Sequence, residues 1–289
     1  MPGHRPGCRV EWGEVMGYRL LALDIDGTLL DSQGRLSPRV ERALQAARNG
    51  GMRVCLVTGR RPRFAWPVYA ALQLEGLMVT LNGGVIVDPV TLETLRVVKL
   101  PREAVSELLH QWHEAGLSAF AYRDTATPPD IYFAVRPTWE PMARYIAEEG
   151  VNAFQVPCLV RSTDWSPLRL SVGDSEPRTL LAGELARPYI DGATMRTYHT
   201  RSYDATWYYE IYPLTSKADG VCALCERYGV DAAEVVAVGD QLNDVEMLEW
   251  AGLGVAMGNA PAEVKARARL VIGHHDEDGL AVFVESLLA

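Results

Sequence analysis

Short apolar runs alternate with amphipathic stretches in the first part of the chain. Residues 18–25 are apolar, rich in leucine, and end in acidic residues and glycine, which is typical of a buried strand. The stretch from Ser37-Pro38 to Asn49-Gly50-Gly51 has one apolar face and the start and stop signals of a helix. The same alternation continues, with strands expected at 52–57 and 77–81. Between them a helix is expected, regular only after Pro67, because a proline inside a helix would break it. This order predicts a parallel sheet with right-handed crossovers.

The pattern changes after Gly84, where strands and helices follow in mixed order without a motif of their own. The expected elements are strands at 85–87, 94–98, 118–122, 131–135, 168–172, 194–198 and 207–211 and helices at 101–115, 140–149 and 177–186. We therefore expect residues 88–205 to form an inserted α+β domain. The α/β rhythm returns at Ser216, so residues 16–87 and 206–289 are expected to form one discontinuous core domain. Residues 1–15 show little periodicity and are expected to be a disordered extension, or upstream sequence from a misplaced start codon.

The composition argues against two classes of protein, nucleic-acid binders and membrane-spanning proteins. The chain has 289 residues, 48% hydrophobic and 22% charged, which is ordinary for a globular protein of two domains. Its net charge of −9 argues against a nucleic-acid partner, although an acidic site can bind a phosphate when a cation lies between them. No apolar run approaches the roughly 20 residues of a membrane span. Five scattered cysteines without a signal peptide favour reduced thiols and a cytoplasmic location.

Polar residues stand at the carboxyl ends of four predicted strands, the edge where open α/β sheets bind ligands. Asp24 and Asp26 alternate by two, so both can face one site, and Gly27 allows a sharp turn. Asp240 and Asp244 add two carboxylates to this edge. Unit charges about 4 Å apart repel by about 4 kcal/mol at an effective dielectric of about 20, and a hard cation such as Mg²⁺ removes this repulsion. A simple turn or an N-capping acid is the plainer interpretation of each motif alone.

Two further motifs complement these acids. Thr58 offers a hydroxyl, and Gly59 and Arg60 offer backbone N–H groups at a helix start, which is a ready anion site. Lys217 begins another helix and brings a positive charge. Taken by itself, Lys217 is more simply an ordinary surface lysine.

Together the motifs resemble those of haloacid dehalogenase (HAD) superfamily phosphatases of the Cof-like type, which carry a large α/β cap (C2B type) after the third core strand. The four motifs are Asp24-Ile25-Asp26-Gly27-Thr28-Leu29-Leu30, Val57-Thr58-Gly59-Arg60, Ser216-Lys217 and Gly239-Asp240-Gln241-Leu242-Asn243-Asp244. Asn82-Gly83-Gly84 and Met257-Gly258-Asn259-Ala260 also match sequence patterns that are common in the family, so the resemblance spans residues 18–289. Ala218 departs from the pattern, because the family often has glycine after the lysine.

The resemblance implies a Rossmann-like core and a mechanism. Asp24 would attack phosphorus to form an aspartyl-phosphate, and Asp26 would serve as general acid and base. Mg²⁺ would be held by Asp24, the backbone carbonyl of Asp26 and Asp240, with Asp244 as a ligand or a support. The phosphoryl oxygens would be bound by Thr58, Gly59, Lys217, Asn82 and Asn243. The cap would close over a small phosphorylated metabolite.

Other polar groups have two interpretations. Arg60, with Arg61 and Arg63, could grip a second phosphate or a carboxylate of the substrate, or simply be an exposed helix start. The cap loop from Arg123 to Asp130 could select substrates, or be a plain hairpin turn. The remaining candidates are expected to be surface or helix residues without a metal, and they are His110, His113, His274, His275, Cys222 and Cys225.

Two rival functions stay open on sequence grounds. One is a phosphotransferase or phosphomutase of the phosphomannomutase type, which would pass the phosphoryl group to a sugar hydroxyl. The other is a non-catalytic phosphate-binding protein on a degenerate core. The sequence names neither the substrate nor the choice between a monomer and a small homo-oligomer.

Overall fold

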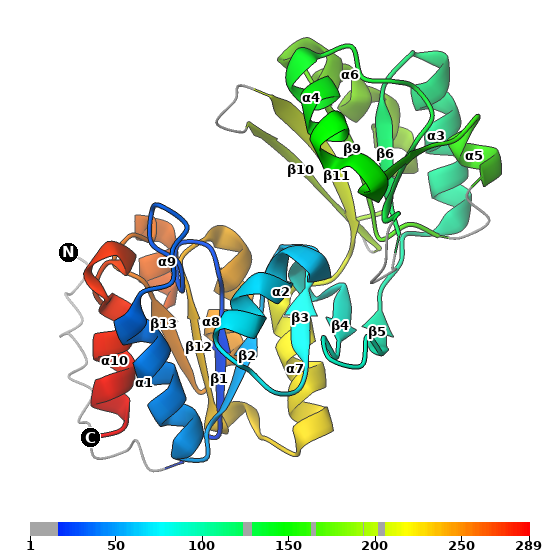
Figure 1. The fold of residues 1–289 in the computed structure, drawn as a ribbon. Helices are drawn as coiled ribbons and strands as arrows, with labels where there is room; N and C mark the ends of the chain where they lie inside the picture. Colours follow the sequence, from blue (N-terminus) through cyan, green and yellow to red (C-terminus); the bar gives the residue numbers. More distant parts are fainter. Residues whose placement is uncertain (1–16, 124–128, 163–165, 193, 202–205) are drawn as a thin grey trace, which may run out of the picture. The chain divides into compact units, whose positions relative to one another are not determined.

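The fold is that of a computed structural model, which describes residues 17–123, 129–162, 166–192, 194–201 and 206–289 (Figure 1). The expected extension at 1–15 and residues 124–128 of the cap loop lie outside the described residues. The described residues form two compact units. One holds the chain up to Gly83 together with Lys217–Ala289, and the other holds Gly84–Ser216.

A parallel sheet forms the centre of the first unit. Its main strands lie in the order β14-β13-β12-β1-β2, all parallel, and β3 extends the β2 side through a parallel bridge between Val57 and Val79. The strands are β1 (Leu20–Leu23), β2 (Arg53–Leu56), β3 (Met78–Thr80), β12 (Val235–Gly239), β13 (Leu253–Ala256) and β14 (Leu270–Val271). Strands β1, β12 and β13 are buried along their whole length, which explains why they read as continuous apolar runs.

Helices connect these strands and cover the sheet. They are α1 (Pro38–Asn49), α2 (Pro62–Ala71), α7 (Lys217–Tyr228), α8 (Val245–Trp250), α9 (Ala262–Arg267) and α10 (Gly279–Leu287). Helix α1 leads from β1 to β2, whereas α8 leads from β12 away to β13, in the opposite direction along the sheet. Right-handed crossovers therefore place α1 and α8 on opposite faces. The strand order reverses between β1 and β12, and in open α/β sheets ligands bind at the carboxyl ends of strands at such a point.

Local sequence explains where two of these helices begin. The hydroxyl of Ser37 accepts a hydrogen bond from the backbone N–H of Arg39 (3.1 Å), and Pro38 occupies the first turn of α1, as the sequence predicted. The expectation that the next helix settles only after Pro67 was wrong. Helix α2 begins at Pro62 and contains Pro67. A first-turn proline favours the helix start, and the internal proline removes one backbone hydrogen bond without ending the helix.

The second unit is built on a six-stranded sheet in the order β10-β11-β9-β6-β7-β8, antiparallel except between β7 and β8. Its strands are β6 (Ala119–Tyr122), β7 (Ile131–Phe133), β8 (Ala153–Gln155), β9 (Arg169–Asp174), β10 (Met195–Arg201) and β11 (Trp207–Pro213), and β4 (Val85–Val87) pairs with β5 (Thr94–Val97) as a hairpin. Its helices are α3 (Arg102–Glu114), α4 (Glu140–Glu149), α5 (Leu159–Ser162) and α6 (Glu176–Ala186). Strand β8 and helix α5 were not predicted, since both are short and lack a periodic apolar pattern.

Both faces of this sheet are covered. Ala119 and Ala121 of β6 belong to the core beneath α3 and α6, whereas Phe120 and Tyr122 belong to a second core on the side of α4. This division follows from the alternation of side chains along a strand. Trp112 of α3 is fully buried, and its indole N–H donates to the carbonyl of Ala182 in α6 (3.0 Å), which joins the two helices.

The second unit is longer at both ends than the expected range of 88–205. Strand β11 belongs to it, because this strand pairs with β9 and β10 from Trp207 onward. The β4–β5 hairpin also falls within this unit. Within the described residues, the helices are all too short or too polar to cross a membrane.

Candidate active site

Asp24 lies directly after β1, beside the end of β12. Its backbone N–H donates to the carbonyl of Val238 (3.1 Å), which continues the pairing of these two strands. The Asp24 residue is buried, with 5% exposure. By contrast, 63% of the Asp26 side chain is exposed. The two carboxylates of the first motif therefore occupy different environments, one inside the unit and one at its surface.

Lys217, the first residue of α7, joins two of the predicted carboxylates. Its Nζ lies 2.6 Å from Oδ1 of Asp24 and 2.6 Å from Oδ1 of Asp244. All three side chains are at most 6% exposed. Lys217 is thus a buried cation between two buried acids, and the interpretation as an ordinary surface lysine is wrong.

Burial dominates the electrostatics of this cluster. Removal from water raises the pKa of Asp24 to about 7, although Lys217 opposes the shift, and the nearby charge of Asp244 adds to it. Burial, followed by the charge of Asp244, also raises the pKa of Asp240. Burial by itself would lower the pKa of Lys217, but attraction to Asp24 and Asp244 raises it above its ordinary value. The site therefore holds more negative charge than Lys217 alone neutralises.

Asp244 is held from two sides. Its Oδ2 accepts backbone N–H groups of Asp240 (3.0 Å) and Gln241 (2.9 Å), while its Oδ1 bonds to Lys217. Gly239 is required beside it, because a Cβ at that position would lie 2.4 Å from Cγ of Asp244. Asp244 accordingly fixes both the loop after β12 and the ammonium of Lys217.

Asp240 has three polar partners that the sequence did not single out as site residues. Thr28 donates to its Oδ1 (3.3 Å), and Gln241 (3.0 Å) and Asn259 (3.3 Å) donate to its Oδ2. Asn259 also donates to the carbonyl of Gly27 (2.8 Å). The sequence did contain a signal for Asn259. Gly258-Asn259 follows β13, which is another strand end at the same edge of the sheet.

Three carboxylates of this edge are arranged as a cation site. Ligand oxygens of Asp24, Asp240 and Asp244 all lie within 4.8 Å of one another, and the three residues are buried. They are oxygen donors, which hard divalent cations prefer. Both oxygens of Asp244 are bonded to Lys217 and to backbone N–H groups, whereas, among the described residues, the oxygens of Asp240 accept only from the neutral side chains of Thr28, Gln241 and Asn259. The residues present fit a divalent metal ion.

The predicted phosphate-binding groups also come together. Thr58 is buried, and its hydroxyl accepts the backbone N–H of Arg60 (3.1 Å). Asn82 takes a left-handed conformation with a φ of 53°, and its Oδ1 accepts a hydrogen bond from the side chain of Asn243 (3.0 Å). A Cβ on Gly59 would lie 3.1 Å from Oδ1 of Asn82. The ends of β2, β3 and β12 thus converge on one small region.

Arg60 contacts the exposed acid of the first motif. Its Nε lies 2.7 Å from Oδ2 of Asp26, and its Nη2 bonds to Oδ1, so the two groups form a bidentate pair. Hydrogen bonding to Asp26 raises the pKa of Arg60 further above its ordinary value. Arg60 therefore already has a partner inside the first unit.

Arg123, the other predicted substrate contact, belongs to the second unit. Its Nη1 lies 3.4 Å from the hydroxyl of Tyr132, and its backbone N–H donates to the carbonyl of Asp130 (2.9 Å), which closes the ladder between β6 and β7. Most of the loop that follows it lies outside the described residues.

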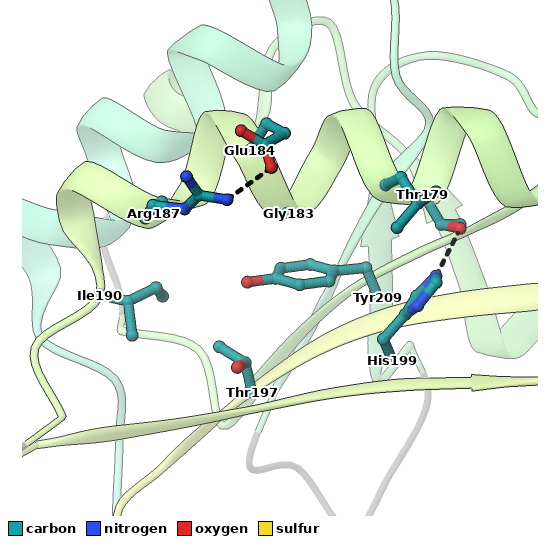
Figure 2. Close-up of a pocket in the computed structure, with 9 residues that line it drawn as sticks. Thr179, Gly183, Glu184, Arg187, Ile190, Thr197, His199 and Tyr209 are labelled. Atoms are coloured by element: carbon teal, nitrogen blue, oxygen red, sulfur yellow. Dashed lines mark hydrogen bonds and ion pairs between the residues drawn. The ribbon is translucent and has the colours of Figure 1, made fainter.

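The second unit also has a pocket of about 390 Å³ between α6 and the strands β10 and β11 (Figure 2). His199 bonds to Thr179 on one side of it (3.0 Å), and Arg187 pairs with Glu184 on the other (2.5 Å). The ring of Tyr209 lies between these pairs, and its hydroxyl end points away from His199, toward the side of Ile190 and Arg187 (Figure 2). The described lining residues include none of the predicted site residues.

Comparison with known proteins identifies the family. Residues 21–132 and 192–284 match the model of the haloacid dehalogenase-like hydrolases. The chain is 30% identical to pyridoxal phosphate phosphatase YbhA of Escherichia coli (strain K12), over 94% of this chain and 100% of that protein. It is 31% identical to the HMP-PP phosphatase of Serratia proteamaculans (strain 568), over 94% of this chain and 96% of that protein.

A solved structure agrees with this assignment. The crystal structure of a haloacid dehalogenase-like hydrolase from Bacteroides thetaiotaomicron superposes with a TM-score of 0.76 at 26% identity, covering 93% of this chain and 98% of that one. The chain therefore belongs to the haloacid dehalogenase-like hydrolases, and the resemblance and α/β fold predicted from the sequence are confirmed. It is a phosphatase of the Cof-like type, an enzyme that hydrolyses phosphate monoesters.

Proposed function

We propose that this enzyme is a Mg²⁺-dependent phosphatase that acts on a small phosphorylated metabolite through an aspartyl-phosphate at Asp24. The buried contact between Asp24 and Lys217, beside Asp240, carries the proposal. A carboxylate buried next to other acids is costly unless cations neutralise it. Such an arrangement is expected where the carboxylate has to meet an anionic phosphate.

The first step forms a bond between a carboxylate oxygen of Asp24 and phosphorus, while the bond from phosphorus to the ester oxygen breaks. Lys217 has three N–H donors, of which two bond to Asp24 and Asp244, and the ammonium can also donate to a phosphoryl oxygen. Thr58, Gly59, Asn82 and Asn243 come from three strand ends around this position and would bind the remaining oxygens. These groups hold the charge as it redistributes in the transition state.

Asp26 is the proposed general acid and base. It would give a proton to the leaving oxygen, and then take a proton from the water that hydrolyses the aspartyl-phosphate. Both of its oxygens bond to Arg60 in the structure described here. At least one of these bonds would have to break before Asp26 could give its proton to the leaving oxygen.

Asp24, Asp240 and the carbonyl of Asp26 are the residues that would hold Mg²⁺, with Asp244 in support. When bound, the ion neutralises phosphate charge, so that an anionic nucleophile can approach phosphorus. Asn259 and Thr28 would keep the carboxylate of Asp240 oriented through their hydrogen bonds.

The substrate class rests on the relatives and on the second unit. Two relatives are named for pyridoxal phosphate and HMP-PP, both small phosphorylated compounds. The unit Gly84–Ser216 is inserted between the second and third motifs, where a cap is expected, and we assign it the exclusion of water and the choice of substrate. Arg123 is our candidate substrate contact in this unit.

The test is a panel of phosphorylated metabolites, including sugar phosphates, nucleotides and pyridoxal phosphate, assayed with Mg²⁺ and after chelation. Phosphate release should require Mg²⁺ and vanish in Asp24→Asn, a variant of nearly the same shape. Acid quenching should trap a phosphoryl group on the peptide that contains Asp24. Undiminished hydrolysis in Asp24→Asn would refute the assigned nucleophile. Transfer to an added sugar acceptor in preference to water would favour a phosphotransferase.

A further inference from the structure

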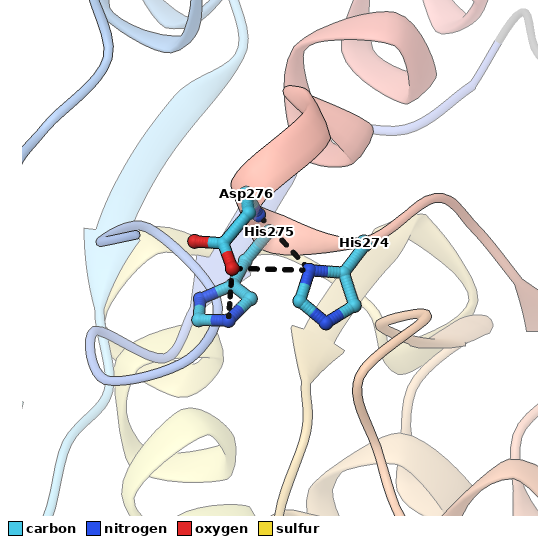
Figure 3. A group of neighbouring side chains, drawn as sticks. All are labelled: His274, His275 and Asp276. Carbon is cyan, nitrogen blue, oxygen red and sulfur yellow. Dashed lines mark hydrogen bonds and ion pairs between the residues drawn. The ribbon is translucent and has the colours of Figure 1, made fainter. Parts of the chain in front are cut away.

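A second group of metal-binding side chains lies outside the active site, in the loop between β14 and α10. Ligand atoms of His274, His275 and Asp276 lie within 4.8 Å of one another. Figure 3 shows both imidazole rings turned toward one oxygen of Asp276. The His275 side chain is only 12% exposed. The sequence predicted surface histidines, but these rings converge.

His275 presents a lone pair to this cluster. Its Nδ1 lies 2.8 Å from the carbonyl oxygen of Leu30. A carbonyl only accepts hydrogen bonds, so Nδ1 carries the proton and the lone pair of the neutral ring is on Nε2. That Nε2 lies 3.8 Å from Oδ2 of Asp276. A ring nitrogen that donates to a carbonyl while the other faces outward is the usual arrangement of a metal-ligating histidine.

His274 and Asp276 complete the group. The backbone N–H of Ser32 donates to Oδ1 of Asp276 (2.8 Å), which leaves Oδ2 directed at the rings. Nδ1 of His274 lies 3.6 Å from that Oδ2 and accepts the backbone N–H of Asp276 (3.2 Å). Accepting this bond requires an unprotonated Nδ1, whose lone pair points at the backbone N–H of Asp276. A cation would take this lone pair in place of the amide.

The spacing and the donors suit a transition metal. With bonds of about 2.0–2.2 Å in a tetrahedral site, neighbouring ligand atoms lie roughly 3.3–3.6 Å apart. The two distances of 3.6 and 3.8 Å are therefore within a few tenths of an ångström of a ligand set. We propose that His274, His275 and Asp276 bind a divalent transition-metal ion such as Zn²⁺, separately from the catalytic site. Imidazole donors favour such ions over Mg²⁺.

The proposed site lies close to the catalytic carboxylates, so the experiment has to distinguish metal binding at the two places. The backbone N–H of His275 donates to Oδ1 of Asn259 (3.2 Å), and Asn259 in turn donates to Asp240. Titration with Co²⁺, a spectroscopic substitute for Zn²⁺, is therefore done on the full chain with Mg²⁺ saturating the catalytic site. One equivalent of Co²⁺ should bind with the visible absorption of a nitrogen-ligated ion, and Zn²⁺ should displace it.

Two variants remove ligands while keeping the loop. His274→Asn retains an N-capping side chain, and Asp276→Asn retains an oxygen that can accept the N–H of Ser32. Each should weaken Co²⁺ binding at least about tenfold. The control is the double variant His110→Gln and His113→Gln on α3, which should bind Co²⁺ like the wild type. Circular dichroism checks that all variants fold.

Three results would overturn the proposal. The first is no nitrogen-ligated Co²⁺ absorption in the wild type. The second is equal Co²⁺ affinity in wild type, His274→Asn and Asp276→Asn. The third is Co²⁺ binding that disappears once Mg²⁺ is saturating, since the catalytic carboxylates would then be its ligands. All of these results are independent of the proposed phosphatase mechanism, because no substrate is used.

Discussion

Nζ of Lys217 lies 2.6 Å from Oδ1 of Asp24, and both side chains are almost completely buried. This contact joins the start of α7 to the end of β1, two points separated by 193 residues in the sequence. The same ammonium bonds to Asp244, so one cation links both acidic motifs. The proposed catalytic edge of the sheet is therefore buried, and charge substitutions there should affect stability as well as activity.

Lys217→Met should destabilise the metal-free protein. The substitution leaves two buried carboxylates without their cation, and breaking a buried pair in this way costs about 3–5 kcal/mol. Urea unfolding at neutral pH in a chelator measures the change, and added Mg²⁺ should recover part of it. Arg144→Met is the control, because its pair with Glu140 is exposed and should contribute far less. Equal stability of Lys217→Met and wild type would contradict the prediction.

The metal-free protein should lose stability as the pH rises. Burial raises the pKa of Asp24 from 3.8 to about 7, so the folded state holds a proton that the unfolded state releases. This contribution is fully present below pH 3.8 and is lost as the pH rises through about 7, with a slope of at most about 1.4 kcal/mol per pH unit. Unfolding of wild type and Asp24→Asn in a chelator isolates this effect. Parallel pH curves for the two proteins would show that Asp24 does not titrate in this range.

Gly27→Ala should damage the site more than an equivalent glycine substitution elsewhere. Gly27 has a φ of 76°, and an added Cβ would lie 2.4 Å from Oδ2 of Asp240. Gly34 has a φ of 73° with nothing within 4 Å of the added Cβ, so it is a matched control. Gly34→Ala should lose about 1–2 kcal/mol from backbone strain alone. Gly27→Ala should lose more stability and nearly all phosphatase activity. Equal losses in both variants would exclude the contact with Asp240 as the cause.

Asn259→Ala should weaken the response to Mg²⁺. Asn259 donates to Asp240 and to the carbonyl of Gly27, and removing such a supporting contact typically lowers metal affinity about 10–100-fold. The Mg²⁺ concentration for half-maximal activity should rise by that factor, while kcat at saturating Mg²⁺ changes little. Asn49→Ala is the control, since Asn49 bonds to Gln45 on the surface of α1. A fall in kcat with an unchanged Mg²⁺ response would place Asn259 in another role.

The sequence by itself determined the architecture of the first unit and the location of its chemistry. Apolar runs gave the strands, and the β-α-β order implied a parallel sheet whose carboxyl ends meet at one edge. That argument alone brings Asp24, Thr58, Asn82 and Asp240 together, because strand ends share an edge whatever the side chains do. The limits of the inserted unit were less accurate, since β11 belongs to it only through pairing with β9 and β10.

The tertiary structure decided which side chains touch. Lys217 could be an ordinary surface lysine until α7 is placed against the end of β1, and Asp26 is exposed and paired with Arg60 although it stands two residues from the buried Asp24. The contacts of Asn259 and the convergence of His274 and His275 were equally absent from the local pattern. The physical reason is that local periodicity fixes backbone elements, whereas hydrogen bonds between distant loops depend on how those elements pack.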